Sequence, residues 1–256
     1  MKAFFAIAVL AVFALALPAC SKTQDIGPDL KNFNVEKSFD QANKYIDDKQ
    51  FDKARQILLE VKGMDKSGRF APLAQLRIAD SYFKDDDMDN AVDQYHKFLE
   101  MYPDHKYAPY AQYQIGMVYY SQIVGTDRGY GAAHKALAEF EALKATYPRN
   151  PYKENVDIKI AKCKDIIAGY ELMVGKFYFD KKAYQGAIGR FETVLDQFPG
   201  YRNEPQVLYM MTASLNATGN KAKAEQYARE LSSKYPDSQY VKKAAKALGV
   251  QISRKQ

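Results

Sequence analysis

The side chains that most often do chemistry in proteins are few in this 256-residue chain, and they are not grouped. The three histidines are His96, His105 and His134, and none stands at the spacing of a metal site or a catalytic triad. Asp85, Asp87 and Asp89 match the start of a calcium-binding loop, but Asn90 and His96 stand where that loop needs glycine and glutamate. We therefore interpret the aspartates as a polar turn before a helix, and we predict no enzyme activity, metal or cofactor.

The first of the two cysteines stands at the end of an apolar segment. Lys2 precedes a run of 15 apolar residues, Ala3 to Leu17, and the string Leu17-Pro18-Ala19-Cys20 follows. The run is shorter than the roughly 20 residues of a membrane-spanning helix, so a cleaved secretory signal is favoured over an uncleaved membrane helix. LPAC resembles the lipobox of bacterial lipoproteins. That resemblance implies removal of residues 1–19 and conversion of Cys20 to an N-palmitoyl, S-diacylglycerol cysteine.

Other features of the sequence indicate the cellular compartment and the kind of partner. Ser21 follows the cysteine, at the position where an aspartate in enterobacterial-type lipoproteins favours retention in the inner membrane. By that resemblance we expect the anchor in the outer membrane, facing the periplasm. Residues 20–34 are polar and predict a flexible tether. Without its signal the chain has a net charge of +5 that is spread along the sequence, which does not favour nucleic acid as a partner.

Small and aromatic residues recur at fixed spacings beyond the tether. Five alanines anchor the pattern: Ala54, Ala91, Ala136, Ala187 and Ala224. Apolar residues follow the anchors by four and seven positions, which places them on one face of a helix. A small residue stands twelve positions before four of the anchors. In the third stretch the matching residue is Gly116, displaced by 8 positions. Four of the stretches end in Tyr-Pro or Phe-Pro, which stops a helix.

A helix pair that repeats in this way is the signature of tetratricopeptide repeats. The anchors lie 37, 45, 51 and 37 residues apart, so we expect extra residues in two of the units. We place a loop at residues 123–130 and one long helix at residues 152–181. The apolar stripe of this helix runs from Val156 and Ile160 to Phe177, and Cys163 lies on it as a buried structural cysteine. A last helix at 240–248, capped by Ser238 and ended by Gly249, closes the stack. The predicted fold is all-α, a tetratricopeptide α-solenoid of about five helix pairs with a C-terminal capping helix.

The repeats and the lipobox together resemble the BamD (ComL) family of outer-membrane lipoproteins. The most specific stretch is residues 165–199. The matching positions there are Glu171, Val174-Gly175, Phe177-Tyr178, Ala183-Tyr184, Arg190 and Phe198-Pro199. The Asp127-Arg128 pair also resembles the family, whereas Asp180-Lys181-Lys182 departs from it where many members carry an arginine.

The resemblance implies a non-enzymatic scaffold of the outer-membrane β-barrel assembly machine. It implies that residues 35–104, repeats 1 and 2, receive the C-terminal segments of unfolded barrel proteins. Our candidate groove residues are Tyr45 and Tyr82, together with Tyr107 and Tyr110, which lie off the packing positions of the repeat. The resemblance further implies that residues 105–250 form a scaffold half that docks a POTRA domain of a BamA-like barrel protein and a BamC-like lipoprotein. Residues 251–256 form a basic tail.

The implied partner contacts are Arg190, Asp127 and Arg128. Arg190 would lie at the edge of its helix, on residues 183–198, with its guanidinium outside the packed face. An ion pair within the chain, with Glu192 or Asp196, is the alternative use of this side chain.

Two other functions are weighed against this one. The first is a periplasmic tetratricopeptide lipoprotein that serves cell division or peptidoglycan metabolism. The second is an enzyme, such as a murein hydrolase with a repeat arm, but no repeat-free stretch is long enough for a catalytic domain.

Overall fold

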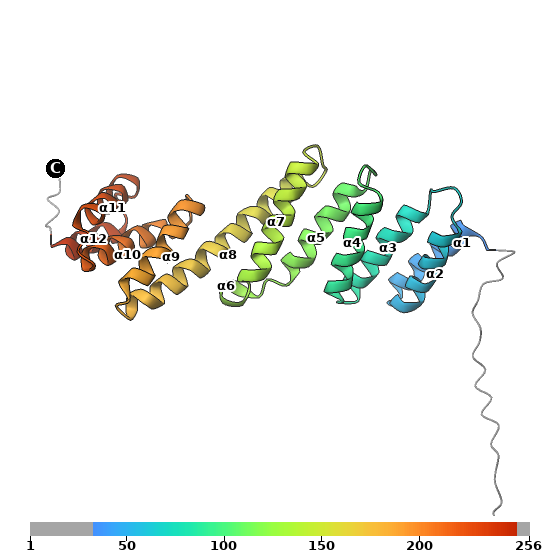
Figure 1. Ribbon diagram of the computed structural model, residues 1–256, viewed down its shortest axis with the longest axis horizontal. Coiled ribbons are helices and arrows are strands. Elements are labelled where there is room, and N and C mark those ends of the chain that lie inside the picture. The colour runs from blue at the N-terminus through green and yellow to red at the C-terminus, as the bar shows by residue number, and fades with distance from the viewer. Residues whose placement is uncertain (1–32, 250–256) are drawn as a thin grey trace, which may run out of the picture. The chain divides into compact units, whose positions relative to one another are not determined.

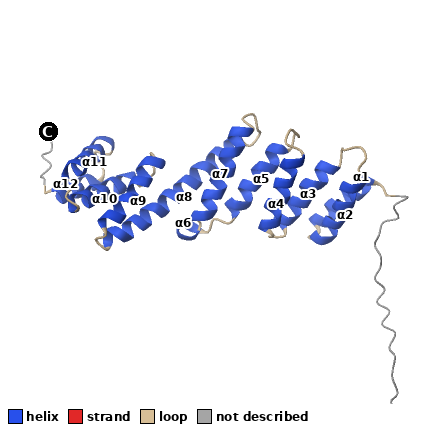
Figure 2. Cartoon of the chain, in the orientation of Figure 1, coloured by secondary structure: helices blue, strands red, loops and turns tan. Residues whose placement is uncertain are grey.

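The computed structural model describes residues 33–249, and within that range every regular element is a helix (Figures 1 and 2). The helical part forms a compact unit of its own, Val35–Gln256. The helices are α1 (Val35–Asp47), α2 (Phe51–Met64), α3 (Ala71–Lys84), α4 (Met88–Met101), α5 (Ala108–Ser121), α6 (Gly125–Arg128), α7 (Tyr130–Thr146), α8 (Lys153–Asp180), α9 (Tyr184–Gln197), α10 (Glu204–Ala217), α11 (Lys221–Lys234) and α12 (Gln239–Leu248). The predicted signal peptide, Cys20, most of the tether and the tail 251–256 lie outside the described residues.

Five antiparallel helix pairs follow one another along the unit. They are α1 with α2, α3 with α4, α5 with α7, α8 with α9, and α10 with α11, and α12 packs on the last pair. Each helix contacts mainly its neighbours in the chain, as Figure 1 shows. This arrangement confirms the predicted tetratricopeptide solenoid. None of the helices described here is both long and apolar enough to cross a membrane.

The repeated small residues allow the two helices of a pair to pack closely. All five anchor alanines are fully buried. A Cβ atom added at Gly116 would lie 2.5 Å from the ring of Phe140, and one at Gly175 would lie 2.5 Å from the ring of Phe191. The glycines of α5 and α8 therefore leave the space that the aromatic rings of α7 and α9 fill.

The long helix α8 differs from its prediction in which side is buried. Val156, Ile160 and Cys163 are buried as expected, but Phe177, placed on the same stripe, is 58% exposed. A stripe with a 3.5-residue period drifts around a straight 3.6-residue helix. In addition, α8 changes partner from α7 to α9 along its length. The buried side at its C-terminal end is instead that of Leu172 and Gly175.

The helix ends follow the sequence closely. Asp87 caps α4 by accepting a hydrogen bond from the backbone N–H of Asn90, so the aspartate turn serves as a helix start. Ser238 caps α12, and Gly249, with φ 73°, ends that helix as expected. The predicted loop at 123–130 is wrong in one respect, because it contains the single-turn helix α6.

Candidate functional site

Arg190, one of the three residues implied in partner binding, contacts a buried carboxylate. Glu171 on α8 is only 2% exposed. It accepts hydrogen bonds from the Tyr130 hydroxyl at 2.9 Å and from Arg190 Nη1 at 3.0 Å. Tyr130 begins α7 and Arg190 lies in α9, so Glu171 connects the third repeat to the fourth. We call Tyr130, Glu171 and Arg190 the Glu171 junction.

The junction satisfies a group that is costly to bury. A carboxylate without hydrogen-bond donors and a cation is strongly disfavoured inside a protein. The hydrogen bond to Glu171 raises the pKa of Arg190, and burial followed by the same kind of bond raises the pKa of Tyr130. The Arg190 side chain is still 43% exposed, so only part of its donor fork is used by Glu171.

Asp127 and Arg128 lie beside this junction on α6. A Cβ atom added at Gly169 of α8 would lie 3.0 Å from the Thr126 side chain, so α6 packs directly on α8. The Tyr130 ring, two residues beyond α6, packs on the Tyr170 ring with centroids 4.2 Å apart. The side chains of Asp127 and Arg128 are exposed, 64% and 77%, and their charged groups are 4.0 Å apart. The fold therefore brings α6 and Arg190 to the same segment of α8.

The ion pair of Arg190 within the chain has a different partner from the expected one. The structure pairs it with Glu171, whereas the sequence suggested Glu192 or Asp196. In the sequence, Glu171 was identified only as an acidic residue that matches the family motif. Its place between the buried residues Ile167 and Gly175 was the available signal, because a carboxylate on a buried stripe needs a partner.

Two of the four tyrosines predicted to line a groove pack between the helices of the first two repeats. Lys53 lies over the ring of Tyr45 at 5.7 Å, and the guanidinium of Arg55 lies over the ring of Tyr82 at 4.3 Å. Arg55 also bonds Asp85 at 2.9 Å and pairs with Asp52. Both tyrosines are thus held by cations of α2.

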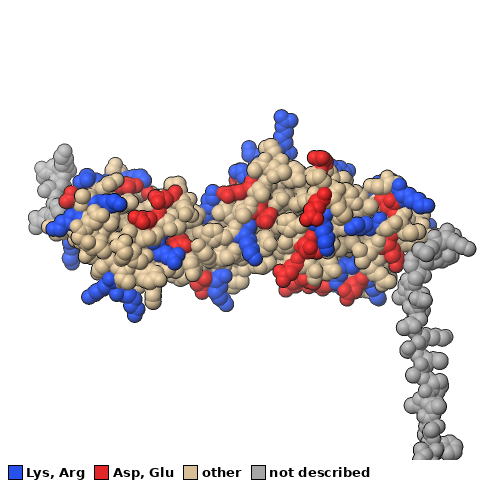
Figure 3. Space-filling model, viewed as in Figure 1, with Lys and Arg blue, Asp and Glu red and all other residues tan. Residues whose placement is uncertain are grey.

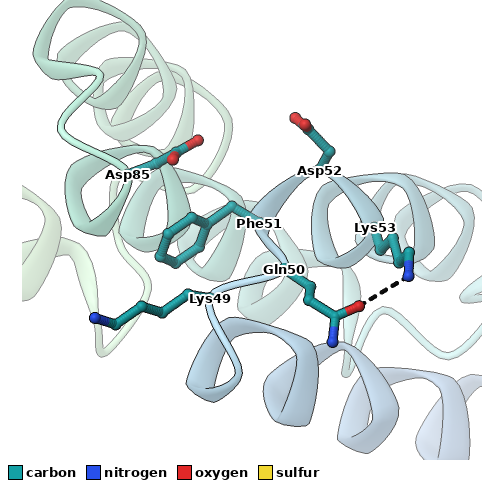
Figure 4. Close-up of a pocket in the computed structure, with 6 residues that line it drawn as sticks. All are labelled: Lys49, Gln50, Phe51, Asp52, Lys53 and Asp85. Atoms are coloured by element: carbon teal, nitrogen blue, oxygen red, sulfur yellow. Dashed lines mark hydrogen bonds between the residues drawn. The ribbon is translucent and has the colours of Figure 1, made fainter.

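A shallow hollow of about 310 Å³ lies next to these cations (Figure 4). Residues of the α1–α2 turn and Asp85 line it, and Lys53 is bonded there to Gln50 at 2.8 Å. Charges of both signs face the hollow, so it does not select for one sign of ligand.

Tyr110 takes part in a buried network that the sequence did not reveal. Asp80, 7% exposed, accepts hydrogen bonds from the hydroxyls of Tyr110 at 2.8 Å and Tyr95 at 2.6 Å. Arg77 binds Asp80 at 3.1 Å and Asn43 of α1 at 2.7 Å. Burial and the Asp80 carboxylate raise the pKa of both tyrosines. The Tyr110 hydroxyl is thus committed to the packing of α3, α4 and α5.

Tyr107 lies apart from this network, in the turn before α5. It is 39% exposed, and its ring contacts the His105 ring at 5.5 Å and the Lys106 ammonium at 5.0 Å. The four tyrosines therefore have separate partners: two lie against α2, one is bound to Asp80, and one is exposed in a turn.

Cys163 is buried as the sequence indicated. Its side chain is fully buried, and burial raises the pKa of its thiol to about 11. A thiol of that pKa is almost entirely protonated at neutral pH, so Cys163 packs as a small apolar residue.

Comparisons with known sequences give a consistent result. The profile of the YfiO family, described as an outer membrane lipoprotein, matches residues 32–231. The chain is 26% identical over 240 residues to the outer membrane protein assembly factor BamD of Rickettsia prowazekii, covering 94% of this chain and 95% of that protein. It is 23% identical to BamD of Neisseria meningitidis serogroup A, covering 89% and 90%.

Solved structures similar to the chain include other tetratricopeptide proteins. The TPR2AB–pHSP90 complex of yeast Sti1 aligns with a TM-score of 0.43 and 15% identity, covering 83% of this chain and 82% of that one. TTC0263 of Thermus thermophilus aligns with a TM-score of 0.35 and 13% identity, covering 85% and 100%.

Proposed function

This chain belongs to the YfiO family of outer membrane lipoproteins, and from that premise we propose that it is a non-enzymatic assembly factor for outer-membrane β-barrel proteins. The observation that carries the proposal is the match to BamD proteins along nearly the whole chain, including every helix pair. No comparable observation supports a role in cell division or peptidoglycan metabolism.

The proposal includes a lipid on Cys20 that holds the repeats at the periplasmic face of the outer membrane. The support is the short apolar run that ends in LPAC. Cys20→Ser should yield either a soluble periplasmic protein or an uncleaved precursor. In cells that are fed a labelled fatty-acid analogue, the mutant chain should not incorporate the label. A mutant that remains labelled would contradict the anchor.

The scaffold half, residues 105–250, binds a BamA-like barrel protein through a POTRA domain and a BamC-like lipoprotein in this proposal. The free part of the Arg190 fork supports it, because a planar guanidinium that already holds one carboxylate still has donors for a second. The exposed Asp127 and Arg128 extend the same surface.

The N-terminal repeats, residues 35–104, receive the C-terminal segments of unfolded barrel proteins in this proposal. Within these repeats the rings of Tyr45 and Tyr82, each in contact with a cation of α2, are available for apolar contact, and the exposed Tyr107 lies just beyond them in the turn before α5. Tyr110 contributes only through its ring, because its hydroxyl is bound to Asp80.

Co-purification of the lipidated chain in mild detergent tests the proposal. We expect a BamA-like barrel protein to co-purify, and Arg128→Glu to weaken its recovery without changing the melting temperature. Arg202→Glu is a matched control, because Arg202 is 67% exposed and, like Arg128, lies beside one carboxylate, that of Asp165 on α8 at 3.2 Å. Recovery of division or cell-wall proteins in place of the barrel protein would refute the assembly role.

A further inference from the structure

The charges of this chain are distributed unevenly along its repeats. Residues 35–104 hold 11 Lys and Arg against 15 Asp and Glu, whereas residues 221–256 hold nine against three. Figure 3 shows acidic side chains gathered below α3 and α4, whereas basic side chains with some acidic ones among them lie over α11 and α12. The basic excess is therefore concentrated at the last two helices.

Three exposed lysines share one side of α12, and two more exposed lysines lie at the start of α11. They are Lys221 and Lys223 on α11 and Lys242, Lys243 and Lys246 on α12. None of the five is paired with a carboxylate within residues 33–249. By contrast, Arg229 and Lys234 are paired with Glu225 and Glu230. We call these five lysines the basic face.

The packing places the start of α11, with Lys221 and Lys223, beside the end of α12, where Lys246 lies. The Asn216 side chain at the end of α10 donates to the carbonyl of Ala247 at 2.9 Å, which fixes the end of α12 beside the α10–α11 turn. Lys221 and Lys223 begin the helix after that turn, and Lys246 precedes Ala247 directly. The Lys243 ammonium lies over the Tyr240 ring at 4.8 Å.

The surface between α11 and α12 is mainly apolar. A groove of about 590 Å³ runs between α11 and α12 and is lined by Ala228, Val241, Ala244 and Leu248. The only acid in its lining is Glu225, which already binds Arg229 at 3.5 Å. No unpaired acid of this groove therefore neutralises the lysines. Burying the apolar part of the groove against a lipid surface costs little free energy of desolvation.

We propose that the basic face of α11 and α12 binds the anionic phospholipid headgroups of the membrane to which this lipoprotein is attached. Lysine ammonium groups are compact point charges without the planar fork that selects one carboxylate, so five of them suit a diffuse anionic surface better than a single acidic side chain. Clusters of four to eight basic residues on an amphipathic helix are typical of such membrane contacts. A lipid anchor would add to this contact by keeping the bilayer close to the chain. This contact rests on the proposed lipid anchor only for the closeness of the bilayer, and it needs no particular protein partner.

Vesicle binding tests the proposal with the unlipidated chain of residues 21–256, which contains the whole compact unit Val35–Gln256. Its binding to phosphatidylcholine vesicles with and without about a third of phosphatidylglycerol is measured by flotation at low and high salt. We expect binding only to the anionic vesicles, at least tenfold stronger in low salt than in high salt.

The variant K242Q/K243Q/K246Q separates the basic face from net charge. It should bind the anionic vesicles at least tenfold more weakly. The matched variant K44Q/K49Q/K53Q, with the same change of charge in α1, α2 and the turn between them, should bind as the parent does. Circular dichroism checks that both keep the parent's helix content. The proposal would be overturned by equal binding to neutral and anionic vesicles, or by an equal loss of vesicle binding in both variants. It would also be overturned if the chain bound no vesicles but captured an acidic protein on the same face.

Discussion

At the scale of single residues, the Glu171 junction explains why α8 carries an acid on its buried side. The carboxylate has two donors from two other helices, and removing either leaves a buried acceptor short of a partner. Arg190 thus has an internal role in addition to the proposed role at the surface. A charge reversal at this position would place two carboxylates together and would disturb the fold as well as any interface.

A double-mutant cycle isolates the junction. Arg190→Gln should lower the free energy of unfolding by about 1–3 kcal/mol, mostly because Glu171 remains buried with one donor and only partly because of lost attraction at a half-exposed site. In a Glu171→Gln background the same change should cost far less. Urea melts of the four proteins measure this difference, and Arg202→Gln serves as an exposed control. Equal costs in both backgrounds would show that the two side chains are not coupled.

Cys163 gives a second test at the residue scale. Burial raises the pKa of the folded thiol to about 11, above the ordinary value of about 9, so the folded state disfavours the thiolate. Its contribution to stability is fully present below the unfolded pKa and is lost as the pH rises from about 9 to about 11. Cys163→Ala should cost about 1 kcal/mol at pH 7 through a small cavity and should flatten this part of the pH profile.

Thiol labelling provides an independent measurement of the same burial. The native chain of residues 21–256 should react slowly with a thiol reagent and the denatured chain quickly, because Cys163 is its one cysteine. Equal rates in both states would contradict the buried position.

At the scale of elements, the turns inside the repeats share a strained position. Five residues before the anchor, the backbone is left-handed in four of the five repeats, at Lys49, Asp86, Lys182 and Gly219. Only the last of these is a glycine, the residue that adopts this conformation without steric cost. The third repeat replaces this turn with the segment that contains α6.

Relief of this strain should stabilise the chain. Lys182→Gly should raise the free energy of unfolding by about 1 kcal/mol, and Asp86→Gly by less, because aspartate tolerates the left-handed region better than lysine. Gly219→Ala should lower it by a similar amount. Thermal melts of the three variants measure these changes, and a loss of stability in Lys182→Gly would contradict the shared turn.

The repeats were predictable because their information is local and periodic. Anchors such as Ala54 and Ala187, and the cap of α12 from Ser238 to Gly249, are read from spacing along one or two helices. The Glu171 junction and the Asp80 network were not predictable in the same way, because each joins three or more helices whose packing the spacing does not specify. The exposed Phe177 is a related case, since its side of α8 depends on which neighbour packs at that end.

At the scale of the whole molecule, the series of helix pairs carries an uneven charge. Residues 35–104 carry a small excess of negative charge, whereas α11 and α12 carry an excess of positive charge. Tetratricopeptide arrays work by presenting such surfaces to several partners rather than by catalysis. This supports a scaffold for assembly.

Depletion of the chain from the bacterium that makes it tests the central claim most directly. The quantity to measure is the amount of folded outer-membrane β-barrel protein, compared with the amount of other outer-membrane lipoproteins in the same cells. An assembly factor predicts that folded barrel proteins fall several-fold while the lipoproteins remain. Normal amounts of folded barrel proteins, together with defects in septa or in peptidoglycan, would contradict it.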